Sequence, residues 1–114
     1  MSADVHIDRA IHPDCHAAHH RHPDDELNVT YNLSSMLREA GFVGWGGIVG
    51  KPAQKVGRHI LAVLDRMERN PGKWRAMNPE NGWGTYDKCL QRRMRYWATR
   101  CRDAGPNDTI GGWL

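Results

Sequence analysis

The stretch from residue 85 to residue 104 constrains the fold more than any other part of this chain. Its apolar side chains recur at helical spacing within one narrow arc, and basic side chains occupy the opposite arc at about 100° per residue. The apolar arc contains Leu90, Met94, Trp97 and Cys101. The basic arc contains Lys88, Arg92, Arg95 and Arg102. This pattern predicts a long helix with one buried face and one basic face.

Two earlier segments show the same periodicity. Residues 33–40 carry apolar side chains at helical spacing, with Asn32 or a neighbour as N-cap and Gly41 as the residue that ends the helix. A second helix is predicted over residues 52–69, with a proline in its first turn. A single helical turn is expected at 71–77.

The two ends of the chain predict strands. Residues 3–7 alternate apolar and polar side chains, and residues 109–114 form a short candidate strand that contains two glycines. Because isolated short strands are only marginally stable, the two are expected to pair with each other across the helical body. The predicted fold class is therefore α+β, a three-helix body with a small two-stranded terminal sheet.

The length of 114 residues allows one domain with a single modest core. Residues 1–27 are expected to form a short strand plus a histidine-rich loop, and residues 28–114 the helical body and the C-terminal strand. The mean hydropathy is −0.71, and the chain has neither a run of about 18 apolar residues nor an uninterrupted apolar stretch at its N-terminus. These features predict a soluble cytoplasmic protein that does not contact a membrane. Three cysteines cannot all pair within one chain and are expected to be reduced thiols.

Two polar and aromatic blocks, residues 28–32 and 78–86, each precede a predicted helix. A helix N-terminus presents free N–H groups and a partial positive charge, which suit an anionic ligand. If the two helix starts lie side by side, their rings and amides would line a stacking pocket for a nucleotide-like ligand. The alternative is that the amides are turn and cap residues and that the tryptophan fills the core. The candidate ligand-binding residues are Tyr31, Asn32, Asn78, Glu80, Asn81, Trp83 and Tyr86.

The basic arc of the last predicted helix is a second candidate surface. Its four side chains could neutralise phosphates, and Tyr96 lies beside them as a stacking ring. The alternative is the ordinary charged solvent face of an amphipathic helix. No helix-turn-helix, ribonucleoprotein or zinc-finger pattern accompanies the arc. Nucleic acid is therefore the alternative partner.

Six of the seven histidines lie within the first 22 residues, and five of them cluster with a cysteine after residue 11. Their spacing would suit zinc if the segment were helical, but every ligand would come from one short segment with no second ligand pair downstream. We therefore expect no metal site, with a solvated loop as the simpler interpretation. The weak candidates for metal binding are His12, Cys15, His16, His19 and His20.

Catalytic signatures are missing from the sequence. It contains no serine–histidine–aspartate order, no phosphate-binding glycine loop and no dinucleotide fingerprint. Glu80 is the only carboxylate between Asn78 and Tyr86, and a lone glutamate after proline caps the following backbone more often than it acts as a base. The sequence predicts a protein that is not an enzyme and needs no cofactor.

The same two blocks resemble a family of small proteins from actinobacteria and their phages to which no activity is assigned. The resemblance covers about residues 28–110 and rests on two patterns, N-x-T-Y-N-L-S-x-M and N-P-E-N-G-W-G-x-Y. This chain departs from the family in the histidine-rich segment and in the basic helix. The matching residues are Asn28, Thr30, Tyr31, Asn32, Leu33, Ser34, Met36, Gly50, Lys51 and 78–86. The resemblance implies a phage-linked protein in a host cytoplasm and a fold that ends in a short strand. It implies no molecular mechanism.

Taken together, the sequence predicts a non-catalytic, phage-linked accessory protein. It would recognise a small nucleotide-like ligand or a host protein through residues 78–86, for instance as an inhibitor of host defence. The alternative is a nucleic-acid-binding or virion-associated structural protein that uses the basic face of the last helix.

Overall fold

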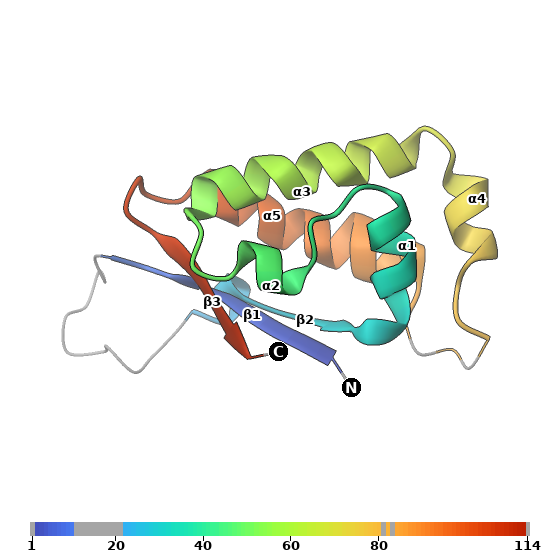
Figure 1. The fold of residues 1–114 in the computed structure, drawn as a ribbon, viewed down its shortest axis with the longest axis horizontal. Helices are drawn as coiled ribbons and strands as arrows, with labels where there is room; N and C mark the ends of the chain where they lie inside the picture. The colour runs from blue at the N-terminus through green and yellow to red at the C-terminus, as the bar shows by residue number, and fades with distance from the viewer. Residues whose placement is uncertain (1, 11–21, 81, 83, 114) are drawn as a thin grey trace.

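One layer of the molecule is a sheet of antiparallel strands, and the other is a layer of helices that covers one face of that sheet (Figure 1). The computed structural model describes residues 2–10, 22–80, 82 and 84–113. The strands are β1 (Ser2–Asp8), β2 (Glu26–Thr30) and β3 (Thr109–Trp113). Their order is β2-β1-β3, so the first strand of the chain lies in the centre.

The predicted pairing of the terminal strands is confirmed. β1 and β3 are antiparallel, with Asp4 opposite Trp113 and Ile7 opposite Ile110. The prediction of two strands is wrong, because β2 pairs with the other edge of β1 and places Leu27 opposite Val5. The alternation of buried Leu27 and Val29 with exposed neighbours is a strand pattern, but it spans only five residues and runs directly into a helical turn.

The helices outnumber the three that the sequence predicts, because several short turns are helical as well. Their bounds are α1 (Ser34–Glu39), α2 (Trp45–Ile48), α3 (Ala53–Glu68), α4 (Pro71–Ala76) and α5 (Arg95–Arg102), with 3-10 turns η1 (Pro23–Asp25) and η2 (Tyr31–Leu33) and a π-helical segment η3 (Tyr86–Met94). η3 and α5 run on without a break, which confirms the long last helix. The expected single turn at 71–77 is α4. No helix in the described part of the chain is both long and apolar enough to cross a membrane.

Side chains and glycines define the helix ends. Gly41 has φ of +101° and directly follows the last residues of α1. The N–H of Phe42 donates to the carbonyl of Leu37 at 3.0 Å and that of Gly41 to the carbonyl of Arg38 at 3.0 Å, which is a Schellman motif. At the start of η2 the cap is Thr30, whose hydroxyl accepts from the N–H of Asn32 at 3.3 Å.

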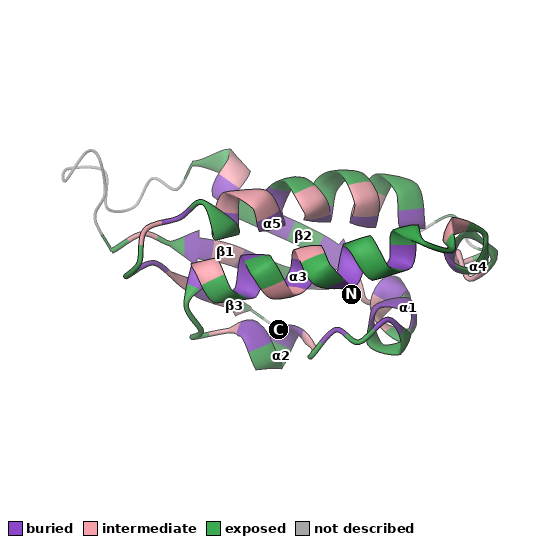
Figure 2. Cartoon of the chain, turned by 90° about the horizontal axis from the view of Figure 1, so that it is seen from above, coloured by how far each residue is buried: buried purple, intermediate pink, exposed green. Residues whose placement is uncertain are grey.

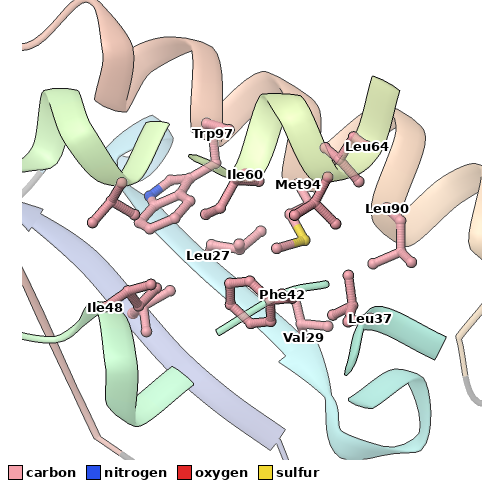
Figure 3. Packing of buried hydrophobic residues seen from close by; sticks show 14 of the residues in the cluster. Leu27, Val29, Leu37, Phe42, Ile48, Ile60, Leu64, Leu90, Met94 and Trp97 are labelled. Atoms are coloured by element: carbon pink, nitrogen blue, oxygen red, sulfur yellow. The ribbon is translucent and has the colours of Figure 1, made fainter. Parts of the chain in front are cut away.

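α3 and α5 run antiparallel and side by side above the sheet (Figures 1 and 2). They approach so closely at Gly57 that a Cβ atom there would lie 2.6 Å from the carbonyl oxygen of Ala98 and 2.8 Å from Cα of Arg102. Both helices send apolar side chains down onto the strands, where Leu27 and Val29 meet them (Figure 3). The predicted apolar arc is confirmed: Leu90, Met94, Trp97 and Cys101 are all at most 1% exposed.

Candidate ligand-binding cleft

The two polar and aromatic blocks of the sequence meet in space. Gly84 has φ of +94°, and a Cβ atom on it would lie 2.6 Å from Cγ2 of Thr30 and 3.4 Å from Cδ1 of Leu33. Only a glycine allows this approach without displacing its neighbours. The start of η2 and the start of η3 are therefore in direct contact.

Tyr86 is buried beside this contact. Its side chain is 1% exposed, and its hydroxyl accepts a hydrogen bond of 2.7 Å from Nε2 of Gln91. Burial raises the pKa of this phenol. The amide oxygen of Asn78 accepts from the N–H of Tyr86 at 2.8 Å and so holds the backbone of the loop. Tyr86 is a core residue, and the expectation that it stacks on a ligand is corrected.

The other predicted pocket residues have different positions. Asn32 and Glu80 are exposed, whereas Tyr31 is half-buried. Asn81 and Trp83 lie outside the described residues. Tyr31 lines a sizeable hollow together with residues of the segment after α1.

A cleft of about 500 Å³ lies between the η2–α1 segment and the glycine-rich segment that leads into the first turn of α2. One wall carries Tyr31, Ser34 and Arg38, which are three and four residues apart and therefore share a helical face. The opposite wall is the run from residue 42 to residue 46. The complete lining is Tyr31, Ser34, Arg38, Phe42, Val43, Gly44, Trp45 and Gly46.

Ring contacts hold the second wall in place. The rings of Phe42 and Trp45 pack edge to face at 4.9 Å, and each side chain is only 7% exposed. Phe42 also stacks on His59 of α3 at 5.9 Å with 20° between the ring planes. Nε2 of His59 accepts a 3.3 Å hydrogen bond from the N–H of Val43. Burial, and then the positive charge of Arg66, lower the pKa of His59, so the neutral ring that can accept this bond is favoured.

The cleft combines aromatic walls, the hydroxyl groups of Tyr31 and Ser34, and one cation. Arg38 is exposed, and no carboxylate is among the residues that line the cleft. A guanidinium presents donors that match carboxylate and phosphate oxygens. This arrangement suits a planar ligand with a negative charge.

The predicted basic arc is divided in the structure. Arg95 donates to Asp65 of α3 at 2.9 Å and lies 3.5 Å from Glu68, so its charge is already paired. Arg102 pairs with Asp103 at 3.1 Å. The two remaining members of the arc, Lys88 and Arg92, are exposed and form no ion pair within the described ranges.

Sequence reasoning missed a buried polar cluster at the other end of the molecule. Asp25 is 4% exposed, and its carboxylate accepts from Arg9 at 2.8 Å and from Arg100 at 2.8 Å. Arg9 also donates to Asp108 at 3.3 Å, and Asp108 accepts from the N–H of Ala10 at 2.8 Å. Burial raises the pKa of Asp25, but the hydrogen bonds from the two arginines outweigh it and hold that pKa below its ordinary value.

This cluster joins residues that are far apart in the chain, so no local pattern could have revealed it. The indole N–H of Trp97 adds a bond of 2.9 Å to the carbonyl of Asp25. Each carboxylate oxygen of Asp25 and Asp108 accepts at least one hydrogen bond from a described residue. The contribution of the cluster is structural.

The predicted metal candidates His12, Cys15, His16, His19 and His20 lie outside the described residues. Within the described part of the chain, no group of three or more histidine, cysteine or acidic side chains is placed to hold a metal ion. No family model matches this chain, and no similar curated protein or solved structure was found.

Proposed function

We propose that the protein is a non-catalytic binding module that takes a small, planar, anionic ligand of the nucleotide type in the cleft beside Tyr31. The main support for this proposal is that aromatic side chains and the Arg38 guanidinium line the same hollow of about 500 Å³. Small-molecule pockets are commonly about 300–1,000 Å³, with apolar walls and a few polar groups that fix orientation.

Each wall has a separate role in this proposal. Tyr31, half-buried on one side, offers a ring on which a base can stack, whereas Arg38 offers its guanidinium to a phosphate. Ser34 lies between them on the same helical face and can donate to a sugar or base oxygen. Gly84 of the 78–86 loop supports the start of η2.

The sequence resemblance adds a biological setting to the proposal. A phage-linked accessory protein in a host cytoplasm would use such a cleft to sequester a nucleotide signal of host defence. A related possibility is that a host protein inserts an acidic or aromatic side chain into the same cleft. Binding of a free nucleotide distinguishes the nucleotide ligand from the host-protein ligand.

The test is isothermal titration of the protein with a panel of linear and cyclic mononucleotides. Arg38→Ala should weaken binding by about tenfold or more, because a charged hydrogen bond contributes roughly 1.5–3 kcal/mol. Tyr31→Ala should weaken it comparably through lost stacking, provided that circular dichroism shows a folded protein. Lys55→Ala, an exposed cation on α3, is the matched control and should bind as the wild type does. Absence of binding by every nucleotide at millimolar concentration would refute the proposal.

A second candidate function rests on the exposed cations of η3. Lys88, Arg92 and Arg93 are exposed on one helix and form no ion pair among the described residues. They could neutralise phosphates of a nucleic acid, whose affinity would then fall steeply with salt, by a log–log slope of about −0.9 for each phosphate contacted. Fluorescence anisotropy with duplex and single-stranded oligonucleotides at low salt tests this. The idea fails if Lys88→Ala combined with Arg92→Ala leaves the affinity and the slope unchanged.

A further inference from the structure

The two edges of the sheet differ in how they are covered. The outer edge of β3 is occupied by the chain before α3, where the N–H of Gly50 donates to the carbonyl of Ile110 at 2.6 Å and the N–H of Ile110 donates to Lys51 at 3.0 Å. Pro52 forms a bridge to Thr109 on the same edge. Within the described ranges, the outer edge of β2 pairs with no strand. An edge strand presents alternate N–H and C=O groups to which another strand can bond.

Two hollows flank this uncovered edge. One, of about 380 Å³, crosses the outer face of the sheet from Trp113 on β3 to Arg93 beyond the edge of β2. The other, of about 180 Å³, lies on the helix side, where Tyr96 and Trp97 line it. Both hollows share Pro23, Glu26, Leu27 and Arg93, so they adjoin each other at the edge of β2.

Exposed aromatic side chains mark both hollows. Trp113 is 83% exposed and Tyr96 is 54% exposed, and they are two of the three large apolar side chains that the described chain leaves in solvent. The hydroxyl of Tyr96 donates to Asp24 at 3.0 Å, which holds the ring in one orientation. Aromatic side chains of this kind dominate binding energy in many protein interfaces.

The carboxylate of Asp4 lies in the outer hollow, and Asp4 is opposite Trp113 in the sheet. Arg93 is the one guanidinium among the described residues that line this hollow. Asp4 accepts a bond from the neutral amide of Asn28 and has no cationic partner among the described residues. An indole face next to a carboxylate is well suited to a lysine or arginine side chain.

We propose that an extended, positively charged segment of a partner protein adds to the outer edge of β2 as a fourth strand. Successive side chains of a strand point to opposite faces. The added strand would therefore place every second side chain in the outer hollow, where Asp4 and Trp113 lie, and the others in the small hollow beside Tyr96. Main-chain bonds to β2 supply affinity, and the two hollows select a segment in which basic and apolar residues alternate.

The experiment is selection of a random 12-residue peptide library, displayed on phage, against the immobilised full chain. Enriched peptides should alternate basic and apolar residues, and in an ¹⁵N-labelled protein they should shift the amide resonances of β2. A synthetic copy of the best peptide with alternate backbone N-methyl groups, which removes donors from one edge, should bind at least about tenfold more weakly. Peptides without a basic bias, or shifts confined to the Tyr31 cleft, would overturn the proposal.

Two surface variants test the groove itself. Trp113→Ala should weaken the selected peptide about tenfold, as removal of an aromatic anchor does. Asp4→Asn keeps the shape of the side chain and should weaken binding while reducing its salt dependence. Asp103→Asn, which removes an exposed carboxylate outside the groove, is the control and should leave affinity unchanged. If sedimentation shows a dimer that Trp113→Ala abolishes and no peptide is enriched, a second copy is the occupant and the proposal is wrong.

Discussion

Gly57→Ala tests whether the crossing of α3 and α5 depends on the absence of a side chain. The added methyl group would lie 2.6 Å from the carbonyl oxygen of Ala98 and 2.8 Å from Cα of Arg102. Ordinary van der Waals contacts of a Cβ atom are 3.4–4 Å, and both neighbours are backbone atoms, so no rotamer change can relieve the overlap. The helices must separate by roughly 1 Å, and such a gap forfeits a quarter to a half of the dispersion attraction between the atoms it parts.

These effects set the expected magnitude. Overpacking of a core by one methyl group costs about 1–3 kcal/mol or more, and the loosened contacts around the crossing add to it. The higher helix propensity of alanine offsets about 0.5–1 kcal/mol of this loss in stability, because glycine is the poorer helix former. We expect a net loss of about 1–3 kcal/mol in the free energy of unfolding. With an m-value of about 2 kcal/mol per molar urea, the urea midpoint should fall by roughly 0.5–1.5 M.

The control for this experiment is Gly72→Ala in α4. A Cβ atom on Gly72 would meet nothing within 4 Å, so this substitution should be neutral or should stabilise the protein by about 0.5–1 kcal/mol. Urea unfolding followed by tryptophan fluorescence measures both variants. If Gly57→Ala is as stable as the wild type, α3 and α5 do not approach each other as closely as described, and the reasoning is refuted.

Three further predictions concern ionisable groups. The pKa of Asp25 in the folded protein lies below 3.8, so its ionised carboxylate stabilises the fold fully above pH 3.8, and this stabilisation is lost as the pH falls through the folded-state pKa. The Asp25→Asn variant should be about 2–3 kcal/mol less stable at neutral pH, and its acid unfolding should depend less steeply on pH. The pKa of His59 is below 6.5, so stability should be full above pH 6.5 and decline below it, and His59→Gln should remove that decline in urea midpoints measured across the range. Burial raises the pKa of Cys101 to about 12, so iodoacetamide at mildly alkaline pH should leave Cys101 unmodified in the folded protein and alkylate it in urea, as mass spectrometry of its peptide would show. Equal modification in both states would contradict this burial.

The parts of the fold that follow from local patterns could be predicted. The buried arc of the last helix is set by spacing within one segment, and Gly41 ends α1 because a left-handed residue is needed there. β2 escaped prediction because its alternation covers too few residues to stand out from the helical turn that follows it. Short elements depend on their neighbours for stability, so sequence alone identifies them poorly.

In the candidate site, too, local features could be predicted from the sequence and tertiary ones could not. The contact between the two polar blocks could be anticipated, but which rings reach solvent depends on tertiary packing. Tyr86 follows a turn-rich loop and still points into the core, where Gln91 holds its hydroxyl. Arg95 belongs to a basic pattern, yet Asp65 on another helix takes up its charge. Tyr31 lines a cleft whose opposite wall contains Trp45, and no spacing rule connects those two residues.

The central place of β1 has a consequence for synthesis on the ribosome. Of the described elements, β1 is translated first and β3, its partner on one side, is translated last. Asp4 therefore leaves the ribosome long before Trp113, the residue opposite it in the sheet. Pairings between such distant residues form slowly, and an unpaired strand invites aggregation while it waits. The nascent chain therefore cannot complete its sheet until β3 has left the exit tunnel, and the domain can fold cooperatively only from that point.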